Sequence, residues 1–263
     1  MLNAKLSNQD YDNPMPTTLL GGLPIVRAGI EESAQGFIDH ALIARGKGWR
    51  PFYSTSANGQ VIALCAKQPA FRDLILSADQ IHADGMPMVL FSTMYSKHPV
   101  VERVATTDLV HAVARKAEKA GVSFYFLGGT EEVNAKAVEV MRANHPRLIF
   151  AGRRHGYFSA EEEAGVLEEI RRVKPDILWI GLGVPREQEF VSRNIERLRG
   201  VGVIKTSGGL FDFVSGKNKR APMWMQRVGL EWACRLWLEP KRLAWRYIIT
   251  NPIALHALLR NSQ

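Results

Sequence analysis

Cysteine is scarce in this 263-residue chain, which contains only Cys65 and Cys234. The two lie far apart in helical patterns, without a CxxC spacing or histidine partners. We therefore expect reduced core residues of a cytosolic protein, not a metal site or a redox pair.

Long apolar runs are also missing, since none reaches the roughly 18 to 20 residues that span a bilayer. The polar N-terminus lacks the apolar core of a signal peptide, so we expect a cytoplasmic protein whose membrane contact is peripheral.

Common nucleotide and metal motifs are absent as well. GxGxxG and GxxxxGK(S/T) do not occur, which argues against a standard dinucleotide site and a P-loop. His82, His111 and His155 show no HExxH or similar ligand spacing, so we interpret them as ordinary surface or core histidines. No repeat of a solenoid or propeller period is present. We expect neither a metal nor another cofactor.

The apolar content of 46% suffices for a large core in one α/β domain, or in one domain with an appendage. Residues 1–18 are polar and contain Pro14 and Pro16, which predicts a flexible tail. Strand and helix patterns alternate over residues 19–216, which predicts a Rossmann-like, mainly parallel sheet covered by helices. Strands are expected at 23–30, 51–55, 80–83, 122–127, 147–151, 176–182 and 201–206. Helices are expected at 31–45, from about 58, from 86, and at 107–120, 131–144, 160–173 and 186–198.

The remaining residues, 217–263, differ in composition and predict a helical appendage. They carry nine Lys and Arg residues against two Glu, a net +7 of the chain's formal +8, and four of the six tryptophans. Trp beside Lys or Arg is typical of a helix at a membrane interface, where each basic residue near an anionic surface contributes about 1 kcal/mol. A solvated basic face over a Trp-containing core helix is the alternative, and composition alone does not decide between them.

Ligands of an open parallel sheet bind beyond the carboxyl ends of its strands. Predicted loops reach that edge at 54–58, 83–87, 127–130, 181–185 and 207–209. Asp84 directly follows a strand, so it is either a helix cap or a general base. Gly128 and Gly129 open a helix, which suits either a phosphate contact or an ordinary tight turn.

Residues 102–109 place charges and hydroxyl groups before another predicted helix. Thr106 or Thr107 would cap that helix in the structural interpretation. Arg103 would pair with an internal carboxylate or bind a ligand.

A series of motifs then occurs in the order known from one family. They are Asp84-Gly, Glu102-Arg-Val-x-x-Thr-Asp108-Leu, Leu127-Gly-Gly, Gly156-Tyr-Phe, Pro175-Asp-Ile-Leu with Gly181-Leu-Gly-x-Pro185, and Lys219-Arg-Ala-Pro-x-Trp-Met-Gln-Arg-x-Gly-Leu-Glu-Trp232 followed by Glu239-Pro-Lys-Arg-Leu243. Over about residues 50 to 250 the chain resembles the WecG/TagA/CpsF glycosyltransferases, glycosyltransferase family 26. The long KRAPxWMQRxGLEW string is the most specific of these motifs.

The resemblance implies an inverting sugar transferase at the cytoplasmic membrane face. Members move a hexose or N-acetylhexosamine from a UDP donor onto a sugar carried by undecaprenyl diphosphate, and they are not known for needing a metal. Their catalytic carboxylate maps onto Asp84, as the base for the acceptor hydroxyl. Their T-x-N element maps onto Ser56-Ala-Asn58, with Thr55 as the catalytic hydroxyl if the register shifts by one. Their appendage arginines, which would close over the diphosphate, map onto Arg235, Arg242 and Arg246.

One departure from the family pattern concerns the donor site. Many members read G-x-P-(K/R)-Q-E, where this chain has Gly183-Val-Pro-Arg-Glu187-Gln188-Glu. The Ala-Asn-Gly-Gln run after the first core strand is closest to the xanthan-type exopolysaccharide glucosyltransferases, so we expect a UDP-glucose donor, with UDP-N-acetylmannosamine or its uronate as the alternative. The expected substrate-binding residues are Asn58, Arg103, Asp108, Gly128, Gly129, Gly183 and Gln188 together with the three appendage arginines.

The expected partners are a UDP-sugar, a polyprenyl-diphosphate-linked sugar and the inner membrane, with association into a homo-oligomer left open. Outside the N-terminal tail the chain has no D-x-D motif, which most sugar-nucleotide enzymes use to hold a divalent ion. Arginines would therefore have to supply the positive charge that offsets the diphosphate.

Nucleic-acid binding is disfavoured because no helix-turn-helix, finger or RNP signature accompanies the basic charge. A nucleotide-dependent enzyme that uses the sheet alone is the other alternative, and it predicts turnover without residues 217–263.

Overall fold

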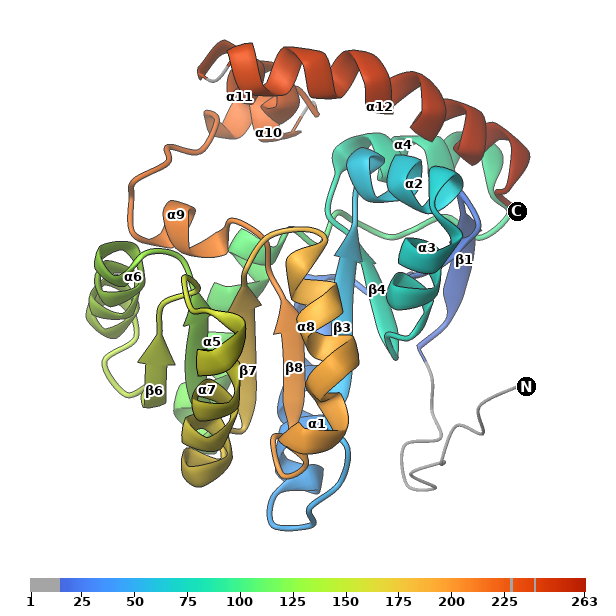
Figure 1. Cartoon of the computed structure of the whole chain (residues 1–263). Coiled ribbons are helices and arrows are strands. Elements are labelled where there is room, and N and C mark those ends of the chain that lie inside the picture. The colour runs from blue at the N-terminus through green and yellow to red at the C-terminus, as the bar shows by residue number, and fades with distance from the viewer. Residues whose placement is uncertain (1–14, 228, 239) are drawn as a thin grey trace.

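A mainly parallel sheet forms the centre of the protein (Figure 1). The computed structural model describes residues 15–227, 229–238 and 240–263, apart from the side chains at 227, 235, 238 and 242. Neighbouring strands follow the order β1-β2-β4-β3-β8-β7-β5-β6, and only β1 and β2 pair antiparallel. The strands are β1 (Thr17–Leu20), β2 (Leu23–Val26), β3 (Phe52–Ala57), β4 (Gln80–Ala83), β5 (Ser123–Gly128), β6 (Ile149–Arg154), β7 (Ile177–Gly181) and β8 (Val203–Thr206). The predicted fold class is confirmed.

Helices cover both faces of the sheet and its carboxyl edge. They are α1 (Ile30–Ala44), α2 (Gly59–Lys67), α3 (Pro69–Leu76), α4 (Met86–Tyr95), α5 (Thr106–Ala120), α6 (Glu131–Asn144), α7 (Ala160–Val173), α8 (Arg186–Asn194), the 3-10 helix η1 (Ile195–Leu198), α9 (Leu210–Val214), α10 (Met223–Arg227), α11 (Glu231–Leu238) and α12 (Pro240–Arg260). Phe124 and Trp179 of the sheet pack with α1, α5, α6 and α9 in one apolar cluster. Tyr125 and Leu178, which point to the opposite face because side chains alternate along a strand, pack with α7, α8 and η1.

The first strand begins earlier than the sequence predicts. Thr17 and Thr18, placed in the predicted tail, belong to β1, while residues 1–14 lie outside the described part of the chain. Gly21 and Gly22 have φ angles of +58° and +80° and join β1 to β2. Two consecutive positive φ angles are what a tight two-residue hairpin requires, and glycine adopts them without strain. The hairpin extends the edge of the sheet beside β4.

The crossovers create a point where the chain changes direction across the sheet. After β5 the chain continues outward to β6, whereas after β7 it continues inward to β8. The loops that follow β5 and β7 therefore lead to helices on opposite faces of the sheet, to α6 on one face and to α8 on the other. Figure 1 shows this edge uppermost, below α10, α11 and α12.

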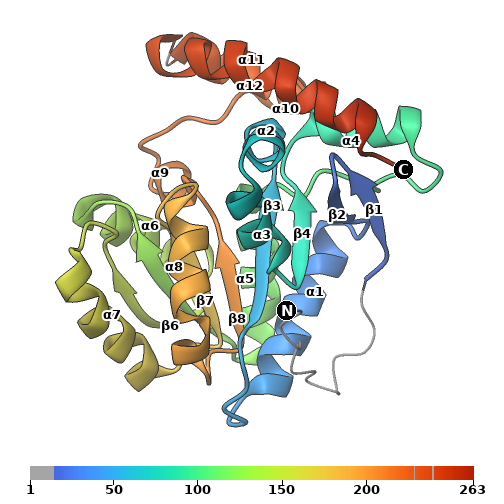
Figure 2. The same cartoon turned by 45° about the vertical axis from the view of Figure 1, so that its right-hand side comes forward.

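The C-terminal helices cross above the carboxyl ends of β3 and β4, and α12 lies along α2 in both views (Figures 1 and 2). Ala254, Ala257 and Leu258 of α12 are buried in the same apolar cluster as Val61 and Ile62 of α2. The chain end also pairs with the hairpin, where the Gly22 N–H donates to the Asn261 carbonyl at 2.8 Å. The end of the predicted appendage is thus part of the core. None of the helices in the described residues combines the length and apolarity that crossing a bilayer requires.

Candidate active site

Asp84 lies where β4 ends, beside the end of β3. The Asp84 N–H donates to the Ala57 carbonyl at 2.9 Å, and Ser56 pairs in register with His82. Because side chains alternate along a strand, Ser56, His82 and Asp84 share one face of the sheet. Gly85 occupies the N-cap position of α4, and no side chain caps that helix. The helix-cap interpretation of Asp84 is therefore wrong, and the carboxylate is half-buried at the ligand-binding edge.

The two candidate hydroxyl groups at the end of β3 lie on opposite faces. Thr55 is fully buried and accepts a 2.7 Å hydrogen bond from the Thr206 hydroxyl. Ser56 is half-buried on the face that Asp84 shares, and its Oγ lies 2.7 Å from the Lys205 Nζ and 3.4 Å from the Thr106 Oγ1. Of the two hydroxyls, only Ser56 lies at this edge beside Asp84. The hydrogen bond between Thr55 and Thr206 joins β3 to β8, and a catalytic role for Thr55 stays a prediction.

Two charged side chains are buried beneath the same edge. The ammonium group of Lys205 is fully buried, and desolvation lowers its pKa to about 8, although the charges of Asp84 and Glu187 oppose that shift. The Glu187 carboxylate accepts the N–H groups of Gly208, at 2.9 Å, and Gly183, at 3.2 Å. Burial raises the Glu187 pKa to about 7 even though these hydrogen bonds lower it. Glu187 thus ties the loop after β7 to the loop after β8.

Glu187 and Gln188, where the chain departs from the family pattern, lie at this connection between the two loops. Gln188 is 1% exposed, and its Nε2 lies 3.4 Å from a Glu187 oxygen. Because Gln188 is buried, its position gives no support to its predicted role in the donor site. Gly183 has a φ of +81° and uses its N–H in the contact with Glu187.

The remaining predicted loop residues have clear structural roles. A Cβ at Gly128 would lie 2.2 Å from the Gly181 carbonyl oxygen, so glycine is required for the close approach of β5 and β7. The Gly129 N–H donates to that same carbonyl, and Thr130 caps α6. Asn58 caps α2 by accepting the Val61 N–H at 3.2 Å. The tight-turn interpretation of the two glycines is confirmed, and substrate contacts at Asn58, Gly128 and Gly129 stay predictions.

Arg103 and Asp108 join the core to the appendage. The Arg103 guanidinium donates to Glu231 of α11 at 2.6 Å and to Asp108 of α5 at 3.4 Å. Asp108 also accepts two hydrogen bonds from Arg220, one of them at 3.1 Å. The Gln226 side chain of α10 is buried and accepts from both arginines. We name these five residues the core–appendage cluster.

Arg103 pairs with carboxylates of the protein, which is one of the two roles expected for it, and its contact with a substrate stays a prediction. The cap expected at Thr106 or Thr107 is wrong, since Ala105 is the N-cap of α5 without a side-chain hydrogen bond. The charge of Asp84 also acts on Arg220, which places that guanidinium within electrostatic reach of the candidate base. Arg246 is half-buried, and its guanidinium carbon lies 5.3 Å from the centre of the Tyr247 ring. The side chains of Arg235 and Arg242 lie outside the described residues.

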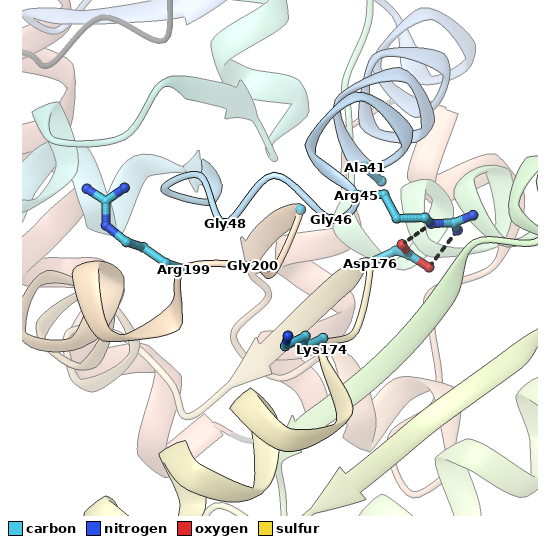
Figure 3. Close-up of a pocket in the computed structure, with 9 residues that line it drawn as sticks. Ala41, Arg45, Gly46, Gly48, Lys174, Asp176, Arg199 and Gly200 are labelled. Carbon is cyan, nitrogen blue, oxygen red and sulfur yellow. Dashed lines mark hydrogen bonds and ion pairs between the residues drawn. The ribbon is translucent and has the colours of Figure 1, made fainter.

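A cavity of about 260 Å³ opens at the other end of the sheet (Figure 3). Its lining residues precede strands, so they lie at the amino edge. Arg45 there forms a two-pronged ion pair with Asp176, with both contacts at 2.9 Å, and Lys174 and Arg199 flank the opening. Because ligands of parallel sheets bind at the carboxyl edge, this cavity is separate from the candidate active site. In the part of the chain that the structure describes, no three His, Cys, Asp or Glu side chains are grouped as metal ligands.

The family model described as the Glycosyl transferase WecG/TagA/CpsF family matches residues 19–263. The chain belongs to this family. It is thus a glycosyltransferase, as its sequence motifs predict. Its relatives include three proteins named N-acetylglucosaminyldiphosphoundecaprenol N-acetyl-beta-D-mannosaminyltransferase. The one from Bacillus spizizenii is 29% identical over 89% of both chains. The one from Bacillus subtilis is 29% identical over 75% of both chains, and the one from Staphylococcus aureus is 28% identical over 73% of this chain and 74% of its own.

Sequence reasoning missed several residues of this WecG/TagA/CpsF family site. Arg220, Gln226 and Glu231 lie inside the KRAPxWMQRxGLEW string, but the string does not say what its charges contact. The complementary charges of Arg103 and Asp108 in a second motif were the available signal. Nothing in the pattern pointed to Lys205, because a lysine in a short apolar strand gives no indication of its depth.

Proposed function

We propose that this glycosyltransferase moves N-acetylmannosamine from a UDP donor onto N-acetylglucosamine carried by undecaprenyl diphosphate. The observation that carries the proposal is the position of Asp84 and Ser56 on one face of the sheet at its carboxyl edge, beside an appendage held by the core–appendage cluster. The activity for which the relatives are named supplies the two sugars. These relatives favour the N-acetylmannosamine alternative and give no support to the UDP-glucose donor expected from the sequence.

In the proposed reaction Asp84 acts as the general base. It takes the proton of the acceptor hydroxyl while that oxygen bonds to the anomeric carbon of the donor sugar. The bond from the anomeric carbon to the diphosphate oxygen breaks on the opposite side, so the product has inverted configuration and UDP departs. A base at the end of a strand, fixed through its own backbone N–H, is held in place for this proton transfer.

The departing diphosphate needs positive charge, and the appendage is its proposed source. Arg220 donates hydrogen bonds to Asp108, and the charge of Asp84 also acts on its guanidinium group. We assign Arg246, Arg235 and Arg242 to the same task on the resemblance and on their place in α11 and α12. Charge-assisted hydrogen bonds from preorganised guanidinium groups stabilise the leaving group most where water is excluded.

The outer side of the appendage is the proposed membrane contact. Trp237 is 87% exposed and Trp245 is 69% exposed, which is unusual for residues of this size. Other apolar side chains are exposed on α4, α10, α11 and α12: Leu90, Met94, Tyr95, Met223, Trp224, Trp232, Ile248, Leu255 and Leu259. On α12 the exposed residues recur at helical spacing, on the side away from the buried Ala254 and Ala257. Exposed tryptophans beside basic residues suit the anionic cytoplasmic leaflet.

A donor screen on the full chain tests the proposed function. The acceptor is a polyprenyl-diphosphate-linked N-acetylglucosamine in anionic vesicles, and UDP-N-acetylmannosamine, UDP-glucose and UDP-N-acetylglucosamine are offered in turn with and without EDTA. We expect a product mass that corresponds to one added N-acetylhexosamine from UDP-N-acetylmannosamine, resistance to the chelator, and protein that sediments with the vesicles. Transfer of glucose alone would overturn the donor assignment.

A matched pair of variants separates membrane contact from chemistry in that screen. Trp237→Ser with Trp245→Ser removes two exposed rings and is expected to release the protein from vesicles while it keeps turnover on a short-chain acceptor in detergent. Trp49→Ser is the control, because Trp49 precedes β3 at the other end of the sheet. Unchanged sedimentation of the double variant would contradict the membrane contact.

A further inference from the structure

Lys205 is a buried cation that the proposed reaction does not use directly. We propose that Lys205 is a positioning residue, which fixes the Ser56 hydroxyl as a hydrogen-bond donor beside Asp84. The inference rests on the proposed function, because it concerns the same site.

The geometry places Lys205 against Ser56, where the charge of the candidate base Asp84 acts on it. It is the third residue of β8, next to β3, and its partner in register is Ser54. Its Nζ reaches along the strand to the Ser56 Oγ at 2.7 Å and to the Thr206 carbonyl oxygen at 3.0 Å. The side chain is fully buried. A buried ammonium group is unfavourable unless it is paired and hydrogen-bonded, so its presence in an otherwise apolar strand requires a reason.

Hydrogen-bond chemistry supplies that reason. An ammonium group has donors only, so the Ser56 oxygen must accept in this contact. The hydrogen of the Ser56 hydroxyl is thereby directed elsewhere. The other group near it is the Thr106 Oγ1, at 3.4 Å, which is a long contact for two hydroxyls. Ser56 is half-buried, so its hydroxyl can instead donate to an oxygen of a substrate bound over the strand ends.

Several charged and titratable groups surround Lys205. The carboxylates whose fields act on it are those of Asp84 and Glu187. His82 is fully buried on the same face of the sheet, and desolvation, followed by the charge of Lys205, lowers its pKa well below the usual value. His82 is therefore neutral at physiological pH. Arg220 acts on Asp84 from the appendage side. Removing the ammonium charge would make the ionised form of Asp84 less favourable.

Lys205→Met tests the assignment in the donor screen described above. Methionine keeps the length and volume of the side chain but has neither charge nor donors. We expect kcat to fall about 10²-fold, the typical result of misplacing a reacting group, with KM for the donor changed less. The acidic limb of the kcat/KM profile should move to higher pH, because loss of a neighbouring positive charge raises the pKa of the base. A purely structural role would not move that limb.

Two further variants identify the route of the effect. If Lys205 acts through Ser56, then Lys205→Met in a Ser56→Ala background adds little to the loss that Ser56→Ala causes alone. Lys205→Gln retains an N–H donor without the charge and should keep more activity than Lys205→Met. If Lys205→Met fails to fold, the activity of Lys205→Gln tests the assignment of Lys205 instead. Lys174→Met is the control, since Lys174 is exposed at the amino edge.

The outcomes separate this inference from the proposed function. If the unaltered chain transfers no sugar from any donor, the proposed function has failed. If the unaltered chain is active and both Lys205 variants stay within about twofold of it with the same pH profile, the assignment of Lys205 is wrong. Additive losses from Lys205→Met and Ser56→Ala would equally overturn it, because the two residues would then act independently.

Discussion

Asp84→Asn is expected to lower kcat by about 10²-fold or more, since this is the usual effect of removing a general base. Asparagine has the same shape as aspartate but does not take a proton from the acceptor hydroxyl. The backbone contact from residue 84 to Ala57 does not involve the side chain, so the strand ends should keep their arrangement. The measurement is steady-state transfer to the lipid-linked acceptor, together with UDP binding by calorimetry, which should be nearly unchanged.

The control for this substitution is Asp73→Asn, which makes the same chemical change on the exposed side of α3. It should leave transfer and binding as they are. If Asp84→Asn instead retains activity within about threefold of the unaltered chain, Asp84 is not the base. A large loss of UDP binding in Asp84→Asn would assign the residue to donor binding.

Asp108→Ala is expected to release the appendage from the core and to reduce transfer by about tenfold or more. Asp108 accepts from Arg220 and from Arg103, so its loss leaves two partly buried guanidinium groups with fewer partners. Breaking such a pair on one side costs more than the pair contributes, and we expect a local cost on the order of 1–3 kcal/mol because the side chains are partly exposed. Hydrogen exchange in α10 and α11 should then become about 10- to 100-fold faster in the free protein.

This experiment also distinguishes the two roles considered for Asp108. A substrate contact would leave hydrogen exchange of the free protein unchanged and would alter only KM and kcat. A connection between core and appendage changes exchange before any substrate is added. Glu31→Ala is the matched control, because Glu31 pairs with Arg115 of the same helix α5 but contacts nothing in the appendage. Its ion pair is exposed and contributes little.

Much of the core was predictable because its signals are local. The alternation of strands and helices gave the sheet, and the position of Asp84 after a strand placed it at the ligand-binding edge. Two elements were not predicted. The helix expected from about residue 58 is α2, but the separate helix α3 after it was not expected; Pro69 opens α3 because proline lacks the N–H that would continue the preceding helix. The other is β1, because Thr17 and Thr18 lie in a polar stretch behind Pro14 and Pro16 that predicted a tail, whereas β2 lies within the strand expected at 23–30.

The site itself depends on contacts between residues far apart in the chain. Glu231 and Arg103 are 128 positions apart, and Lys205 and Ser56 are 149 apart. A charge pattern in one sequence shows that such residues need partners but not which partners they find. The composition of residues 217–263 likewise left a membrane-facing helix and a core helix as alternatives, whereas the structure shows that Ala254 and Ala257 of α12 are buried with α2 while Trp245 is exposed.

The central claim is that the sugar nucleotide binds at the carboxyl ends of β3, β4 and β8, under the appendage. A crystal structure of the full chain with UDP tests this most directly. We predict a diphosphate within hydrogen-bonding distance of guanidinium groups of the appendage, with the vacant sugar position beside Asp84 and Ser56. UDP in the cavity at the amino edge beside Arg45 and Lys174, or a diphosphate held by a metal ion away from Asp84, would contradict the account.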